Sequence, residues 1–70
     1  MYTLHDPERH VTWTAEQADA SALRYAERLF GTTPAPELTP GPPPPPGVDQ
    51  ALTLRGATGA TVTVHVTHVR

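Results

Sequence analysis

The sequence lacks cysteine, lysine, asparagine and isoleucine, and it has one serine and one tryptophan. Without cysteine, neither disulfides nor thiolate metal ligands can stabilise the fold. A chain of 70 residues buries only about 60% of the surface that it exposes when unfolded, so we expect marginal stability that a partner chain would raise. Lysine, asparagine and isoleucine all have AT-rich codons, so the composition favours a high-GC genome, such as that of an actinobacterium or its phage.

Positive charge is scarce, because 5 arginines stand against 7 acidic residues for a net charge of −2, and the arginines form no cluster. Binding of nucleic acid through its phosphates is therefore disfavoured. The apolar runs fall far short of the roughly 20 residues that span a bilayer, and the first ten residues lack a signal-peptide pattern. We expect a cytoplasmic protein without membrane contact, or a virion component if a phage encodes it.

The first 13 residues predict a tight β-hairpin. Asp6 and Pro7 suit the first two positions of a type I turn that runs to Arg9. This turn would pair His5 with His10. Alternation of side chains then places one set on the core face, Tyr2, Leu4, Val11 and Trp13, and another on the solvent face, Thr3, His5, His10 and Thr12.

An alanine-rich amphipathic helix should follow. Thr14 and Gln17 have the spacing of a capping box, and Gly31 is the expected stop after Phe30. At 100° per residue, the buried stripe would comprise Ala15, Ala18, Ala22, Tyr25, Ala26 and Leu29, flanked by Leu23 and Phe30. The outward residues would be Gln17, Ser21, Arg24, Glu27 and Arg28.

Residues 34–47 are so rich in proline that we expect neither helix nor sheet to run through them. The segment is predicted to be an extended arm, serving as a stiff spacer or as a ligand for an aromatic groove. We expect the arm, and the hairpin that follows it, to contact another protein chain. The candidate contact residues in the arm are Pro42, Pro43, Pro44, Pro45 and Pro46.

Residues 48–70 predict a second hairpin. A three-residue loop with Gly59 in the left-handed conformation pairs Leu54 with Val62, whereas a four-residue loop would split the apolar residues between two faces. The other face would be rich in threonine and suited to solvent or to a partner sheet. If the last strand lay at an edge, it could pair with another chain, so the remaining candidate partner contacts are Thr61, Thr63, His65 and Thr67.

Catalytic and metal signatures are weak. Ser21 has no histidine within a helical turn, so we predict that the protein is not an enzyme. His5 and His10 would be cross-strand neighbours in the expected register and are weak metal candidates, but two exposed ligands leave most of the coordination sphere to water. We expect no metal and no cofactor.

The predicted fold class is α+β, in three segments: a hairpin and helix over residues 1–33, the arm over 34–47 and a hairpin over 48–70. The second hairpin would either join the first in one sheet or be delivered to another subunit. We interpret the chain as a non-enzymatic protein-binding or assembly component that associates with a partner or with itself. The alternatives are a small regulator or inhibitor of one protein target and, less favoured, a histidine-based metal- or ligand-binding module.

Overall fold

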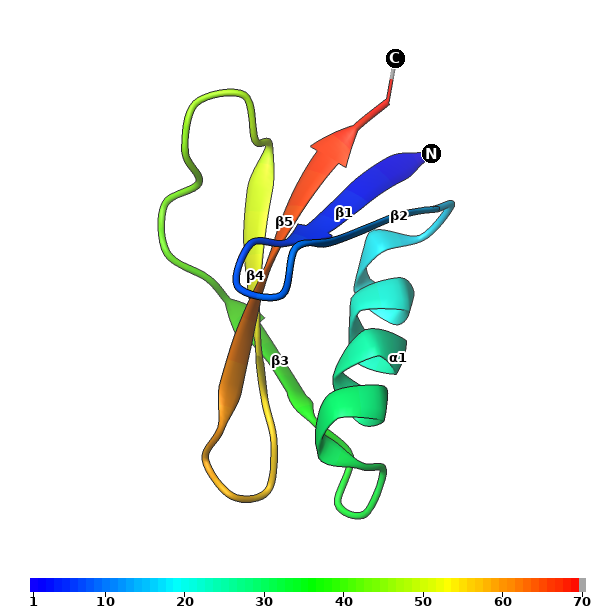
Figure 1. Ribbon diagram of the computed structural model, residues 1–70, viewed down its shortest axis with the longest axis vertical. Helices are drawn as coiled ribbons and strands as arrows, with labels where there is room; N and C mark the ends of the chain where they lie inside the picture. The colour runs from blue at the N-terminus through cyan, green and yellow to red at the C-terminus, as the bar shows by residue number, and fades with distance from the viewer. Residues whose placement is uncertain (70) are drawn as a thin grey trace.

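A five-stranded antiparallel sheet with one helix on one face forms the structure, a computed structural model that describes residues 1–69 (Figure 1). The elements along the chain are β1 (Tyr2–Asp6), β2 (Val11–Ala15), α1 (Ala18–Phe30), β3 (Glu37–Pro40), β4 (Gln50–Arg55) and β5 (Thr61–His68). Across the sheet, the strands lie in the order β2-β1-β5-β4-β3. The predicted α+β class is therefore confirmed.

The β4–β5 hairpin has the predicted register. Leu54 pairs with Val62 and Leu52 pairs with Val64. Gly59 has a φ of 85°, and its N–H donates to the Gly56 carbonyl at 3.1 Å. The apolar residues of both strands thus lie on one face of the hairpin, as strict alternation requires.

The β1–β2 hairpin differs from the prediction by two residues. His5 pairs with Thr12, and Asp6 pairs with Val11, so the loop between the strands consists of residues 7–10. The difference arises because Asp6, expected in the turn, is the last residue of β1. A shift by an even number keeps every side chain on its expected face, so the core assignment of Leu4 and Trp13 survives the wrong register.

Helix α1 starts three residues later than a cap at Thr14 would require and ends where predicted. Thr14 and Ala15 pair with β1 as part of β2, and Gln17 occupies the N-cap position without a side-chain hydrogen bond. At the other end, the N–H of Gly31 donates to the Glu27 carbonyl at 2.8 Å. Among the described residues, no helix is long and apolar enough to cross a membrane.

The segment predicted to be an extended arm contains a strand, β3. Glu37–Pro40 lies within residues 34–47, yet it pairs with β4, with Leu38 opposite Leu54. Proline is tolerated there because β3 is an edge strand, where half of the backbone N–H groups need no partner, and because Pro36 and Pro40 stand outside or at the end of the strand. The expectation that no sheet could run through this segment is wrong.

The two hairpins share one sheet because β5 pairs with β1. Strand β5 is therefore central, and the prediction that it might offer a free edge is wrong. The second hairpin also contacts α1 of its own chain, and its expected contact with another chain stays a prediction. Residues from all three predicted segments contribute strands to this sheet.

The core lies between the sheet and α1. The helix contributes the small residues Ala22 and Ala26, whose methyl groups allow close approach to the strands. The strands contribute the bulky buried side chains Leu4, Leu52, Leu54, Val62, Val64 and Val66. Consequently one face of the sheet is buried against α1, and the other face is not part of this core.

Candidate protein-binding surface

Threonine is the most frequent residue on the face of the sheet opposite α1. Cross-strand partners point to the same side, so the strand registers assemble residues from all five strands on this face. We call this surface the threonine face, and it comprises Thr3, Thr12, Thr14, Thr39, Thr53, Thr61, Thr63 and Thr67 with His5 and His65. Within residues 1–69, no helix covers it (Figure 1).

The sequence predicted part of this surface. Thr61, Thr63, His65 and Thr67 lie on one side of β5, and Thr63, His65 and Thr67 are only partly exposed because β1 and β4 flank them. Thr39 was missed because its strand was not expected. Thr14 was missed because it was read as a helix cap, although its alternation with Thr12 was a signal for a longer strand.

Two histidines lie side by side at the centre of the threonine face. His5 pairs with His65 across β1 and β5, with ring centroids 6.5 Å apart. The Nδ1 atom of His5 lies 2.8 Å from Thr12 Oγ1. This pairing could not be predicted from the sequence, because it depends on the contact between the two hairpins.

The predicted pairing of His5 with His10 is wrong. His10 lies in the loop after β1, is exposed, and has a left-handed φ of 55°. The weak metal site on these two histidines therefore loses its geometric basis. Among residues 1–69, no group of three or more His, Asp or Glu side chains could hold a metal ion.

Among the strand residues, charge on this side of the sheet is confined to one corner, and Asp49 stands just before β4, where it accepts a hydrogen bond from the His68 N–H at 2.7 Å. Arg55 and Glu37 are cross-strand partners on β4 and β3, next to Thr61. The remaining positions on the face carry hydroxyl, methyl and imidazole groups. Depletion of charged residues is the compositional mark of the buried centre of protein interfaces, so the threonine face has the chemistry of a docking surface.

The five consecutive prolines lie in an exposed loop beside this face. Residues 41–49 connect β3 to β4 and bulge away from α1 (Figure 1). The loop is anchored at both ends: Gly41 N–H donates to the Ala51 carbonyl at 3.0 Å, and Asp49 N–H donates to the Val66 carbonyl at 3.0 Å. The prolines are thus held against the sheet while their rings stay exposed.

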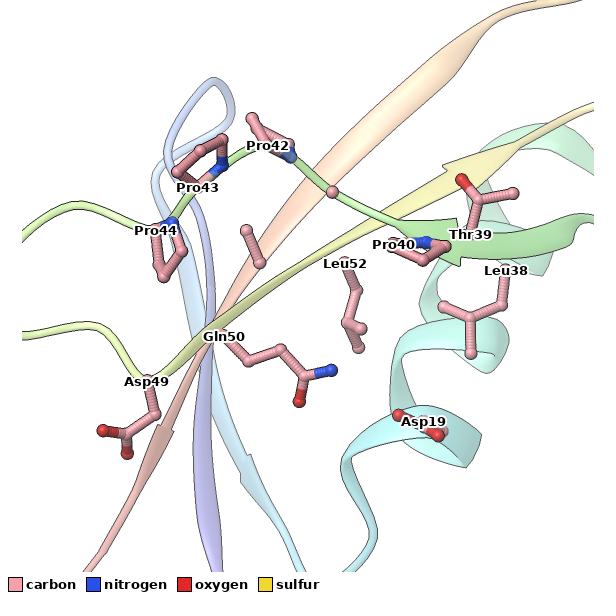
Figure 2. Close-up of a pocket in the computed structure, with 12 residues that line it drawn as sticks. Asp19, Leu38, Thr39, Pro40, Pro42, Pro43, Pro44, Asp49, Gln50 and Leu52 are labelled. Carbon is pink, nitrogen blue, oxygen red and sulfur yellow. The ribbon is translucent and has the colours of Figure 1, made fainter.

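A hollow of about 540 Å³ lies under the start of this loop (Figure 2). Figure 2 shows Pro42, Pro43 and Pro44 along the loop above β4, with Gln50 on the strand and Asp19 on α1 at the other side of the opening. Strand β3 ends at Pro40, so Gln50 and Ala51 of β4 pair with β5 but have no partner on β3. The hollow is a notch in this edge of the sheet.

A buried polar cluster ties the first hairpin to the helix on the opposite side of the sheet. Asp6 is 0% exposed and accepts hydrogen bonds from Tyr25 Oη at 2.6 Å, Arg9 at 3.1 Å and the Glu8 N–H at 3.0 Å. Trp13 donates from Nε1 to Ser21 Oγ at 2.7 Å. Ser21, predicted to face solvent, therefore takes part in the packing of α1 on β2.

The shifted pKa values of the titratable groups in this cluster lie far from neutral pH. Burial raises the pKa of Asp6, but the hydrogen bonds from Tyr25, Arg9 and Glu8 outweigh it and hold the pKa below its ordinary value. Burial, together with the adjacent Asp6 carboxylate, raises the pKa of Tyr25 to about 12. Asp6 stays ionised and Tyr25 stays protonated, so the pair holds the fold and exchanges no proton near pH 7.

Comparisons of the chain with known protein families, with curated proteins and with solved structures gave no match.

Proposed function

We propose that this protein is a non-enzymatic assembly component that associates with protein chains, including copies of itself, through the threonine face. The observation that carries the proposal is a sheet face with little charge that no helix covers among residues 1–69, beside an anchored and exposed proline loop. Threonine side chains present methyl groups and hydroxyls together, so such a face can pack on a second sheet and satisfy its polar atoms there.

The chemistry of the buried cluster also favours a non-catalytic role. Asp6 and Tyr25 form the one titratable pair with shifted pKa values among the described residues, and the shifts move both groups away from proton transfer at neutral pH. All polar side-chain atoms buried within residues 1–69 have hydrogen-bond partners. The cluster is best explained as a device that positions α1 on the first hairpin.

The size of the face determines how the interface would be built. The five strands lie about 4.8 Å apart, and each is about five residues long at roughly 3.4 Å per residue. The sheet therefore has a footprint of about 400 Å². A standard protein interface buries about 800 Å² on each partner. The threonine face therefore supplies about half of what a stable contact needs, and we propose that the proline loop at residues 42–46 supplies the rest.

Light scattering coupled to size exclusion, over a range of protein concentrations, tests self-association. We expect an oligomer that the double substitution Thr63→Arg with Thr67→Arg converts to a monomer, because arginine places charge at the centre of the interface. The matched control is Thr58→Arg in the exposed turn between β4 and β5, which should leave the oligomer intact. Circular dichroism verifies that each variant is folded.

A monomer at every concentration would contradict the assembly proposal for this surface. In that case the alternative of a small regulator of one protein target becomes the better proposal, and it requires a discrete one-to-one complex that the same two arginine substitutions abolish. A virion location remains a proposal that rests on composition alone. If a phage encodes the protein, mass spectrometry of purified particles of that phage would test it.

A further inference from the structure

The sheet has one unguarded edge, and it lies at β2. Strand β2 has a neighbour on one side only, β1, and none of Val11–Ala15 is a proline. The other edge, β3, is four residues long and is bracketed by Pro36 and Pro40. Short length and proline are common devices against edge pairing, and β2 has neither, so β2 is the edge at which another extended chain could add.

A groove runs beside this edge, between β2 and α1. One hollow of about 350 Å³ is lined by Val11, Trp13, Ser21, Arg24, Tyr25 and Arg28. A second hollow of about 400 Å³ shares Ser21 and Arg24 with the first and extends along the strand past Ala15 to Glu16, so the arginines lie toward the Val11 end and the one carboxylate in the lining lies at the other end. The two hollows together span the length of β2. An extended segment that added to β2 would direct every second side chain into this groove.

Two arginines give the helix wall of the groove a positive charge. Arg24 and Arg28 are exposed, and neither forms an ion pair with any group of residues 1–69. They stand four residues apart on α1, so both lie on one face of the helix. Side chains at positions i and i+2 of an added strand point to the same side of that strand. Acidic residues at these two positions would therefore both face the wall that carries the arginines.

We propose that the groove between β2 and α1 binds an extended acidic segment of a partner protein, with glutamates at alternate positions that pair with Arg24 and Arg28. The segment adds to β2 as a sixth strand through main-chain hydrogen bonds. The glutamate methylenes cover Val11, which is 39% exposed, and the exposed edge of Trp13. This groove lies on the helix side of the sheet and shares only Thr14 with the threonine face, so the inference does not rest on the function proposed above.

A second copy of this chain is a poor occupant of the groove. Two copies joined by antiparallel pairing of their β2 strands would place their α1 helices side by side on one face of the extended sheet. Arg24 and Arg28 of one copy would then face the same arginines of the other, and like charges in an interface oppose association. Charge complementarity thus favours an acidic partner.

Binding of designed peptides to the intact protein tests the proposal. The probe is the capped peptide Thr-Glu-Thr-Glu-Thr-Thr-Thr, and its matched control is Thr-Glu-Thr-Thr-Glu-Thr-Thr, with the same composition but the wrong glutamate spacing. Trp13, the only tryptophan, reports binding by fluorescence, and calorimetry gives the stoichiometry. We expect one site per chain and at least tenfold tighter binding of the first peptide than of the control or of its lysine analogue.

Charge reversal and backbone blocking separate the proposal from nonspecific attraction. The double substitution Arg24→Glu with Arg28→Glu should transfer the preference to the lysine peptide, whereas Arg55→Glu, on the opposite face of the sheet, should change nothing. N-methylation of the peptide backbone should abolish binding. Three outcomes would each overturn the proposal. The first is equal affinity for the glutamate and lysine peptides, and the second is binding that either the arginine reversal or N-methylation leaves unaffected. The third is a dimer of the free protein that Val11→Glu disrupts.

Discussion

The two halves of the sheet meet the same helix in different ways. The buried side chains that β4 and β5 present to α1 are all aliphatic, among them Leu54 and Val64, whereas β1 and β2 present Leu4 together with Asp6 and the partly exposed Trp13. Aliphatic burial is strong but has no direction. The hydrogen bonds of Asp6 and Trp13 have defined partners on α1. The comparison indicates that one half supplies most of the stability and the other fixes how the helix lies.

The turns of the two hairpins also differ in whether a polar side chain stabilises them. The β4–β5 turn depends on the backbone of Gly59, which takes a φ of 85°. The β1–β2 turn depends on a side chain, since Asp6 Oδ1 accepts from the N–H groups of Glu8 and Arg9 at 3.0 and 3.4 Å. Thus the β4–β5 turn requires the conformational freedom of glycine, whereas the β1–β2 turn requires the Asp6 carboxylate, which also binds the helix.

Leu54→Ala should cause the largest loss of stability, because Leu54 is fully buried at the centre of the aliphatic half. Removing such a side chain leaves a cavity and lowers the free energy of unfolding by about 3 kcal/mol. A domain of this size has roughly 4 to 10 kcal/mol in total. Urea unfolding followed by circular dichroism measures the change. A loss below about 1 kcal/mol would contradict the assignment of the main stabilising role to this half.

Asp6→Asn should cost about 2 kcal/mol, since the amide replaces a charged acceptor of several hydrogen bonds in a buried site. The control is Tyr25→Phe, which removes one donor and leaves Asp6 paired with Arg9, and it should cost about half as much. Near-ultraviolet circular dichroism should also lose intensity in Asp6→Asn, because the packing of Trp13 on Tyr25, with ring centroids 4.6 Å apart, depends on the orientation of α1. An unchanged aromatic signal would argue against an orienting role for Asp6.

Gly59→Val should destabilise the protein by about 1 to 2 kcal/mol, because a β-branched residue resists the left-handed conformation. The effect should be confined to the β4–β5 turn. Amide exchange measured by NMR should accelerate in that hairpin and not in β1. If exchange accelerated equally in both hairpins, the two halves would not be distinct units.

A difference in pH dependence should be the smallest effect, since it arises from one carboxyl group. The pKa of Asp6 is lowered in the folded protein, so the unfolded chain takes up a proton at a higher pH than the folded chain does. Its contribution to stability is complete at neutral pH and is lost as the pH falls through the lowered pKa. Unfolding free energies at pH 7 and pH 3 should therefore differ less in Asp6→Asn than in the wild type.

The aliphatic half was predictable from sequence and the polar half was not. Strict alternation through Leu52, Leu54, Val62 and Val64 admits one register, because a shift by one residue would move every side chain to the wrong face. In the first hairpin, Asp6 followed by Pro7 has the composition of a turn. Only the tertiary contact with Tyr25 makes it favourable to extend the strand and bury the carboxylate.

The same reasoning explains which parts of the candidate surfaces could be foreseen. The threonines of β5 follow directly from alternation along one strand. The His5–His65 pair, the contribution of Thr39, and the groove beside β2 all require knowledge of which strands become neighbours. That information lies in contacts between segments distant in sequence, on which local propensity has little bearing.

The central pairing of β1 with β5 has a consequence for the order of folding. These strands come from opposite ends of the described chain, and the N–H of Val69 donates to the Met1 carbonyl at 3.0 Å. During synthesis, β1 emerges first and must wait for β5, so the sheet closes only after translation has passed residue 68. The adjacent ends also allow a circular permutant, with a short glycine linker between them and new termini opened in the proline loop, in which β1 and β5 become neighbours in sequence and the sheet should form faster.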